Sequence, residues 1–329
     1  MRTRMIRRKT TIALTLFFLL ASLLRQSVAE GKTTNRVSCE PVGRVLSLGF
    51  LNFASGSLLC KGDRLQVVNA TKAELLCFSS GQIVTVTGNL KDASKCDSSV
   101  KRRGLWRCIA EFIPRRCVLP SNNPVLLRPY GYTLINNRPF LSWQPVVKAT
   151  SYVVEIAGLG VHWQKTVDGT TLLYPKEQPA MQFGNAYKVN VITYQADSPV
   201  SASSAVFNVL SESKAKQVKT VVKRIQSLNL SPDDEAYLDL SAIYASKDLY
   251  TEAIELLKAR AKAGSQNPGV YRTLGEFYLE AILPDLAETE FKIATKLAQA
   301  ANNHIEFKKA QAGLEIIKRY RSAAIQYAS

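Results

Sequence analysis

The chain has 329 residues, and 46% of them are hydrophobic, which is ordinary for globular proteins and excludes a chain too polar to bury a core. Its length accommodates about two or three domains. The formal net charge is +17, so any partner bound mainly through charge is expected to be an anion.

The N-terminus has the pattern of a secretory signal peptide. Residues 1–9 carry five positive charges and no acid, residues 11–24 are almost wholly apolar, and Ser27 and Ala29 occupy the small-residue positions of a signal-peptidase site. The apolar stretch is short for a membrane span, which needs about 20 residues. We expect residues 1–29 to be removed and the protein to be exported to the periplasm, the cell surface or the medium; an uncleaved membrane anchor is the alternative.

Six cysteines fall within 79 residues, and no cysteine follows them. An even, clustered set in an exported chain predicts up to three disulfides. A zinc site is the alternative, but the closest two cysteines have eight residues between them, whereas a zinc knuckle has about two to four. The candidates are Cys39, Cys60, Cys77, Cys96, Cys108 and Cys117.

Positive charge is concentrated in this cysteine-rich segment. Residues 30–118 contain 14 Lys and Arg against 7 Asp and Glu, a balance of +7. The densest basic patch comprises Lys101, Arg102, Arg103, Trp106 and Arg107. For an exported protein, we expect such a patch to meet lipid headgroups, lipopolysaccharide or acidic glycans rather than nucleic acid. An ordinary solvated surface is the alternative.

Residues 37–120 show short strands separated by turn residues, which predicts a small all-β domain. Part of this segment follows the pattern G-x-x-L-x-x-G-D-x-L and a later glycine, at Gly56, Leu59, Gly62, Asp63, Leu65 and Gly81. It resembles the FecR-like periplasmic domain, but the long cytoplasmic segment of FecR-type regulators has no counterpart here. An envelope stress sensor is therefore only a third hypothesis. Cys60 and Cys77 fall on strands expected to be neighbours, and we predict that these two cysteines form a disulfide.

Residues 124–210 show seven further short strand patterns with turn residues between them, which indicates a β-sandwich. The segment resembles a fibronectin type III domain, because Trp143 lies on the second strand and Tyr187 opens the penultimate one. That resemblance implies that Trp143 fills the core between the sheets and that Tyr187 makes a corner hydrogen bond. A sugar-stacking platform of Trp143, Trp163 and Tyr174 is the alternative.

Residues 212–329 change to a helical period, with Ser231 and Pro232 as a helix start. Residues 234–267 and 268–301 repeat one apolar pattern 34 residues apart, and residues 215–228 and 307–320 can cap the two ends. The pattern resembles the tetratricopeptide repeat (TPR). The positions it assigns to helix packing are Tyr237, Leu240, Ser241, Tyr244, Ala253 and Leu257, then Tyr271, Leu274, Gly275, Tyr278, Ala287, Phe291 and Ala294.

The resemblance to TPR proteins implies a groove for a short peptide or helix of an unidentified partner. First-helix positions not used for packing line that groove, namely Leu238, Ala242, Ala245, Arg272, Glu276 and Leu279. The alternatives are that the repeats only pack against the sandwich or form a homodimer.

No catalytic motif accompanies these patterns. His162 and His304 have no companion at metal-ligand spacing, and no HExxH, GxSxG or P-loop sequence occurs. We therefore expect no enzyme activity, no cofactor and no metal. The predicted protein is multidomain, with two β domains followed by an all-α region. We expect an interaction scaffold of the cell envelope, or alternatively a module that binds acidic glycan or the envelope surface through its basic N-terminal domain.

Overall fold

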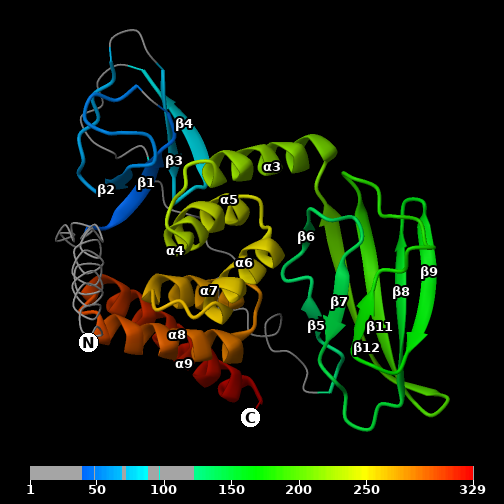
Figure 1. Cartoon of the computed structure of the whole chain (residues 1–329). Helices are drawn as coiled ribbons and strands as arrows, with labels where there is room; N and C mark the ends of the chain where they lie inside the picture. The colour runs from blue at the N-terminus through cyan, green and yellow to red at the C-terminus, as the bar shows by residue number, and fades with distance from the viewer. Residues whose placement is uncertain (1–38, 48, 69–71, 88–95, 97–121, 329) are drawn as a thin grey trace, which may run out of the picture. The chain divides into compact units, whose positions relative to one another are not determined.

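A computed structural model describes residues 39–328, apart from residues 48, 69–71, 88–95 and 97–121, and it leaves out the side chains of residues 323–328 (Figure 1). The predicted signal peptide, the basic patch at Lys101–Arg107, Cys108 and Cys117 lie outside the described residues. Glu40–Ser329 form one compact unit. In the described part of the chain, no helix is both long and apolar enough to cross a membrane.

The first part of this unit is a four-stranded antiparallel sheet with the strand order β2-β1-β3-β4. Its strands are β1 (Pro41–Val45), β2 (Leu58–Cys60), β3 (Ala73–Cys77) and β4 (Gln82–Val86). The turn after β2 explains the Gly-Asp pair of the sequence: Gly62 has a φ of +89°, which favours glycine, and the Asp63 carboxylate accepts a hydrogen bond of 2.8 Å from the Cys60 N–H. Apolar side chains such as Leu59, Leu65 and Leu75 form its core.

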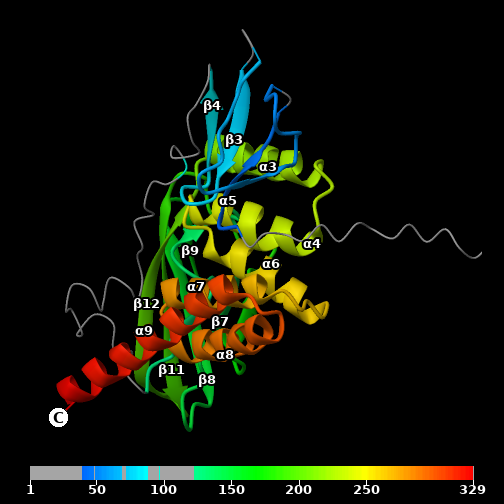
Figure 2. The ribbon, with the colours of Figure 1, turned by 90° about the vertical axis from the view of Figure 1, so that its left-hand side faces the viewer.

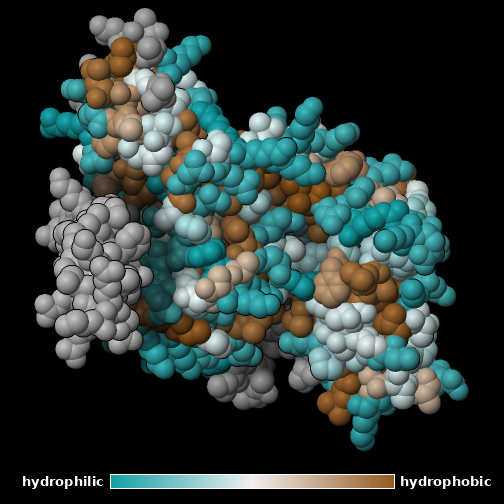
Figure 3. Space-filling view, in the orientation of Figure 1, coloured by the Kyte–Doolittle hydropathy of each residue, from teal (hydrophilic) through white to brown (hydrophobic). Residues whose placement is uncertain are grey.

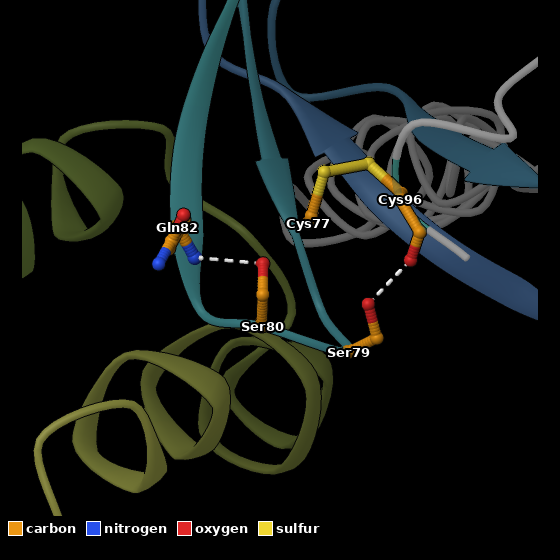
Figure 4. The surroundings of a disulfide bond; sticks show 5 residues. All are labelled: Cys77, Ser79, Ser80, Gln82 and Cys96. Carbon is orange, nitrogen blue, oxygen red and sulfur yellow. Dashed lines mark hydrogen bonds between the residues drawn. A yellow bond between two sulfur atoms is a disulfide. The ribbon is translucent and has the colours of Figure 1, made fainter. Parts of the chain in front are cut away.

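Cysteine pairing in this sheet differs from our prediction. Cys77 is bonded to Cys96, with 4.8 Å between the two Cα atoms (Figure 4). Cys39 and Cys60 each take part in a disulfide as well. The predicted Cys60–Cys77 bond is wrong because β1 lies between β2 and β3, which places the two strands about 10 Å apart, beyond the reach of a disulfide.

A β-sandwich follows, made of a three-stranded sheet in the order β10-β7-β5 and a five-stranded sheet in the order β6-β12-β11-β8-β9. The strands are β5 (Leu126–Arg128), β6 (Thr133–Leu134), β7 (Phe140–Trp143), β8 (Ser151–Gly158), β9 (Val161–Val167), β10 (Thr171–Leu173), β11 (Ala186–Gln195) and β12 (Ser198–Val209). Alternating burial along β8 and β11 shows that one face of the larger sheet lies in the core.

The large aromatic side chains of the sandwich pack in its hydrophobic core. Trp143 is buried and packs edge-on against Tyr152, and the Tyr187 hydroxyl donates to the Leu159 carbonyl at 3.0 Å. Trp163 and Tyr174 are also buried, and the indole N–H of Trp163 donates to the Tyr174 hydroxyl at 3.2 Å. Because all three proposed platform residues are buried, the sugar-stacking alternative is wrong.

The remainder of the chain is helical. The elements are α3 (Glu212–Gln226), α4 (Pro232–Asp234), a π-helical turn η3 (Glu235–Leu240), α5 (Ser241–Ala245), α6 (Tyr250–Lys262), α7 (Pro268–Glu280), α8 (Pro284–Ala300) and α9 (His304–Ala328). Ser211 and Ser231 cap the first two helices by accepting from Lys214 and Asp234 N–H groups. Figures 1 and 2 both show the helices following one another in a stack from α3 to α8 and α9.

Small residues allow the last three helices to approach closely. A Cβ atom added to Gly275 of α7 would lie 2.9 Å from the Phe291 ring of α8, and one added to Gly313 of α9 would overlap the same ring. Phe291 itself is fully buried. The ring therefore fills the space that two glycines leave between three helices, which is close packing of the kind that fixes helix spacing.

Candidate interaction surfaces

The six residues predicted to line a partner groove lie mainly in the interior of the molecule. Leu238 and Ala242 are each 8% exposed, Arg272 is 9% exposed and Leu279 is fully buried. Ala245 and Glu276 are half-buried. These six residues thus do not form an open groove, since four of them are buried and two are half-buried. On the face that Figure 3 shows, hydrophobic residues form small areas among hydrophilic ones.

The N-terminal sheet contacts the helices at the β3–β4 turn. Gly81 of that turn approaches so closely that an added Cβ would overlap the backbone of Ala242, and its φ of +60° also favours glycine. Near this turn, Leu46 and Leu76 belong to a buried cluster with Leu240 and Ile243. Val218 and Ile225 of α3 belong to the same cluster. The cluster joins the residue that follows β1 to β3, η3 and α5 in one apolar core.

An ion pair lies beside this cluster. The Arg44 guanidinium donates to both carboxylate oxygens of Asp239, at 2.6 to 3.1 Å, and to the Gly56 carbonyl at 3.1 Å. The Arg44 and Asp239 side chains are 5% and 0% exposed. Burial raises the pKa of the Asp239 carboxyl, and the Arg44 guanidinium opposes that rise. A second pair, Arg224 with Glu74 at 2.6 Å, links α3 to β3.

The sandwich contacts the helices through the segment that follows β5. The Tyr130 N–H donates to the Thr251 hydroxyl at 2.8 Å, and that hydroxyl donates to the Tyr130 carbonyl at 3.2 Å. The Tyr130 ring packs edge-on against Tyr278, with 6.0 Å between ring centroids. Arg128 forms an ion pair with Glu255. Helices α6 and α7 therefore contact the segment from Arg128 to Tyr130 through backbone hydrogen bonds, an aromatic ring contact and an ion pair.

Arg272 and Glu276, which we expected to contact a partner, belong to a structural ion pair network. Arg272 donates to Glu306 at 2.6 Å and to Glu276 at 2.8 Å, and it thereby ties α7 to the start of α9. Glu306 was not among the residues predicted from the repeat pattern. It lies 34 residues after Arg272, at the interval of the repeat, and that spacing was a signal that the two residues occupy corresponding places on adjacent helices.

The predicted packing residues lie on the facing sides of the helices. Ala253, Leu257, Leu274, Ala287 and Phe291 are at most 1% exposed, as is Ala294. Leu240, Ser241, Tyr271 and Tyr278 are buried, whereas Tyr237 and Tyr244 are partly buried at the edge of the helical core. The Ser241 hydroxyl donates to the Ala236 carbonyl at 2.7 Å, so its polar atom has a partner inside the helix.

No group of at least three histidine, cysteine or acidic side chains that could hold a metal ion occurs among the described residues. His162 is exposed on β9, and His304 is exposed at the first position of α9. Burial raises the pKa of Glu252 in α6 to about 7, and its Oε2 has no hydrogen-bond partner in the described part of the molecule.

No protein-family model and no curated protein matches the sequence. Four solved chains match, and one of them is the fn3 domain of human collagen alpha-1(XX) chain, which is 19% identical. The match covers 29% of this chain and 92% of that domain, with a TM-score of 0.22.

Proposed function

We propose that the protein is a non-catalytic, exported scaffold of the cell envelope whose helices bind polypeptide segments. The observation that carries this proposal is the contact between the helices and Tyr130. Thr251 bonds both backbone groups of Tyr130, while Tyr278 contacts the ring. Proteins recognise extended peptides by this combination of backbone hydrogen bonds and side-chain contacts. In this protein α6 and α7 make these contacts with Tyr130, a residue of the same chain.

We assign the helical part to TPR-type repeats within the same proposal. Support comes from the succession of helix pairs and from the 34-residue interval, which relates Tyr237 to Tyr271 and Arg272 to Glu306. The close approach of Gly275 to Phe291 is the contact expected where a small residue of one helix meets a large residue of the next. We likewise retain the FecR-like and fibronectin III-like identities of the two β parts, supported by the Gly62–Asp63 turn and by buried Trp143.

The covered groove changes how the scaffold would work. Because Leu238, Ala242 and Leu279 are buried, an external peptide has no access to them in the folded chain. We propose that the helices hold both β parts in one unit and that a partner protein binds this assembled unit. The ion pair of Arg44 and Asp239 and the backbone bonds of Tyr130 then serve to keep the parts together.

Export is part of the proposal. All four cysteines among the described residues are disulfide-bonded, which is typical of an oxidising compartment such as the periplasm or the medium. We propose that the predicted signal peptide directs the chain there.

Binding of an acidic glycan or of the anionic envelope surface is a second candidate. The basic balance of residues 30–118 favours it, and so do Lys61, Arg64 and Lys72, which are exposed on the same part of the chain. The charges of the basic patch, Lys101–Arg107, add to this set in sequence. Attraction between exposed charges falls steeply with salt, which distinguishes this mode from binding by packed helices.

Cross-linked capture from an envelope extract, with the full mature chain as bait, separates the candidates. For the scaffold, wild type and Gly169→Leu should recover the same polypeptide at low and high salt. Gly313→Leu, which forces a side chain into Phe291, should lose that polypeptide. Gly169 is the matched control because nothing lies within 4 Å of its added Cβ.

For the polymer binder, replacing Lys101, Arg102, Arg103 and Arg107 by Gln should abolish binding to acidic glycan or anionic vesicles. A chain that binds neither contradicts both proposals.

A further inference from the structure

One edge of the five-stranded sheet is open along part of β12. This strand pairs with β11 along its whole length, but on its other side it pairs with β6 only at Asn208 and Val209. Among the residues that the structure describes, none pairs with the outer edge of residues 201–207. The strand thus presents unpaired backbone groups on that side.

The backbone groups that point outward can be identified from the neighbouring bonds. Asn208 and Leu210 donate their N–H groups outward, to the carbonyls of Tyr132 and Leu134, whereas Val209 donates inward to Asn185. Inward and outward direction alternate along a strand. The N–H and C=O groups of Ala202, Ser204 and Val206 therefore point away from β11. Their side chains are exposed on the outer face of the sheet.

This open part of the β12 edge, called the window below, is limited at both ends. On one side β6 covers the edge from Asn208 onward. On the other, the pairing of β11 and β12 shifts register between Ser201 and Pro199, which marks a bulge. The open edge is thus about five residues long, from Ala202 to Val206.

The window lacks the features that protect edge strands from pairing. Residues 198–209 contain no charged side chain, whereas β9 at the opposite edge of the same sheet carries Lys165. A charged side chain, above all lysine, is a common protection of edge strands, and Pro199 of β12 lies outside the open window. The edge of β12 between Ala202 and Val206 is therefore suited to accept another strand.

The side chains of the window complement a second copy of themselves. In an antiparallel pairing centred on Ser204, Ala202 of each copy lies opposite Val206 of the other, so a small residue meets a larger one. All three outward-facing residues then pair, which forms about six backbone hydrogen bonds. A pairing centred on Ser203 would use only Ala202 and Ser204 and would place Val206 against the bulge.

The absence of charged side chains on this edge also favours a second copy of the chain as the partner. The chain is strongly basic, and an uncharged edge lets two copies meet without direct repulsion. In the neighbouring strand β11 the charged residue is Lys188, which pairs with Val206. In the self-paired arrangement the two β11 strands are separated by both β12 strands, about 14 Å, which exceeds the Debye length of about 8 Å at physiological salt.

We propose that two copies of the mature protein associate by antiparallel pairing of their β12 edges, centred on Ser204, so that one sheet continues across both copies. The contact is short, so the dimer should be weak and concentration-dependent. This proposal rests on the sandwich alone and does not depend on the scaffold function.

Sedimentation equilibrium of the mature chain tests the proposal. The average mass of the wild type should rise toward twice the monomer mass with concentration. Ser204→Lys and Ser204→Glu should each raise the dissociation constant at least about tenfold, because two like charges would meet on the symmetry axis. An equimolar mixture of the two variants should restore dimers. Thr166→Lys and Thr166→Glu on β9 are the matched controls and should dimerise as the wild type does.

A wild type that stays monomeric at every concentration overturns the proposal, and so does a Ser204→Lys variant that dimerises normally. Failure of the mixture to restore dimers overturns the pairing centred on Ser204. Hydrogen exchange of the wild type gives an independent measurement: protection of the amides of Ala202, Ser204 and Val206 should increase with protein concentration, and unchanged exchange contradicts the proposal.

Discussion

Arg44 and Asp239, 195 residues apart in the sequence, form a buried, bidentate ion pair that joins the N-terminal sheet to the helical part. Neither side chain is more than 5% exposed. Asp239 lies in the π-helical turn η3, between α4 and α5. The pair adjoins the apolar cluster of Leu46, Leu76 and Ile243, so charge and hydrophobic contacts act at the same junction. Among the helical elements, η3 and α5 contribute residues to this junction.

Loss of one partner of this pair should be costly. Arg44→Met leaves the Asp239 carboxylate buried without its partner, which should lower the free energy of unfolding by about 3–5 kcal/mol. The double variant Arg44→Met with Asp239→Leu removes both charges and should recover most of that loss. Thermal and urea unfolding, with limited proteolysis of the junction, measures both effects. Equal destabilisation by the single and double variants would contradict a role for the charge pair.

Gly313→Ala should destabilise the helical part by about 1–3 kcal/mol, because its new methyl group overlaps the Phe291 ring. This sign is informative, since Gly→Ala in an open helix position stabilises by about 1 kcal/mol. Thermal unfolding is the measurement, and Gly169→Ala, with nothing near its added Cβ, is the control. The added substitution Phe291→Leu should recover part of the loss in Gly313→Ala. A more stable Gly313→Ala protein would show that the three helices are not packed as described.

Glu252 should make stability fall as pH rises. Its pKa is about 7 in the folded protein, raised by burial from an ordinary value of 4.5. Between these two values the folded state binds more protons than the unfolded state, so raising the pH through this window favours unfolding. We expect Glu252 to contribute about 1–3 kcal/mol to this loss, which should level off above pH 7. Urea unfolding from pH 4.5 to 8 measures it.

The matched variant Glu252→Gln removes this titration. Its free energy of unfolding should therefore vary less with pH between 4.5 and 7 than that of the wild type. The difference between the two proteins isolates Glu252 from the other titrating groups. Parallel pH profiles for wild type and Glu252→Gln would contradict the raised pKa.

Non-reducing peptide mapping should recover Cys77 linked to Cys96 and no peptide that links Cys60 to Cys77. Replacing Cys77 and Cys96 together by Ala should destabilise the N-terminal sheet by about 2–4 kcal/mol, because the bond closes a loop of 19 residues. The wild type under reducing conditions is the comparison for thermal unfolding. Recovery of a Cys60–Cys77 peptide would show that the strand order of the sheet is different.

Local patterns of the sequence were sufficient for the order of strands and helices. The prediction that β structure is followed by helices is confirmed, with β12 ending at Val209 and α3 beginning at Glu212. Ser211 caps that helix, and this contact depends only on residues three positions apart. The burial of Trp143 and Tyr187 also agrees with the strand pattern, because alternate residues of a strand face the same side.

Contacts between distant segments could not be predicted in the same way. Arg272 and Leu238 occupy helix faces that look available in a repeat pattern, but Glu306 pairs with the first and other segments bury the second. The disulfide prediction failed because strand order is not sequence order, and β1 separates Cys60 from Cys77. Each outcome depends on which surfaces meet, and a local pattern carries no information about that.

The sequence by itself determined where strands and helices form and which residues repeat at 34-residue intervals, because periodicity, caps and turns act over a few residues. Only the tertiary structure decided that the Tyr130 backbone hydrogen-bonds to Thr251 and that Arg44 pairs with Asp239. The physical reason is that a side chain becomes core, ion pair or open surface according to the segment that covers it, and that segment is supplied by folding of the whole chain.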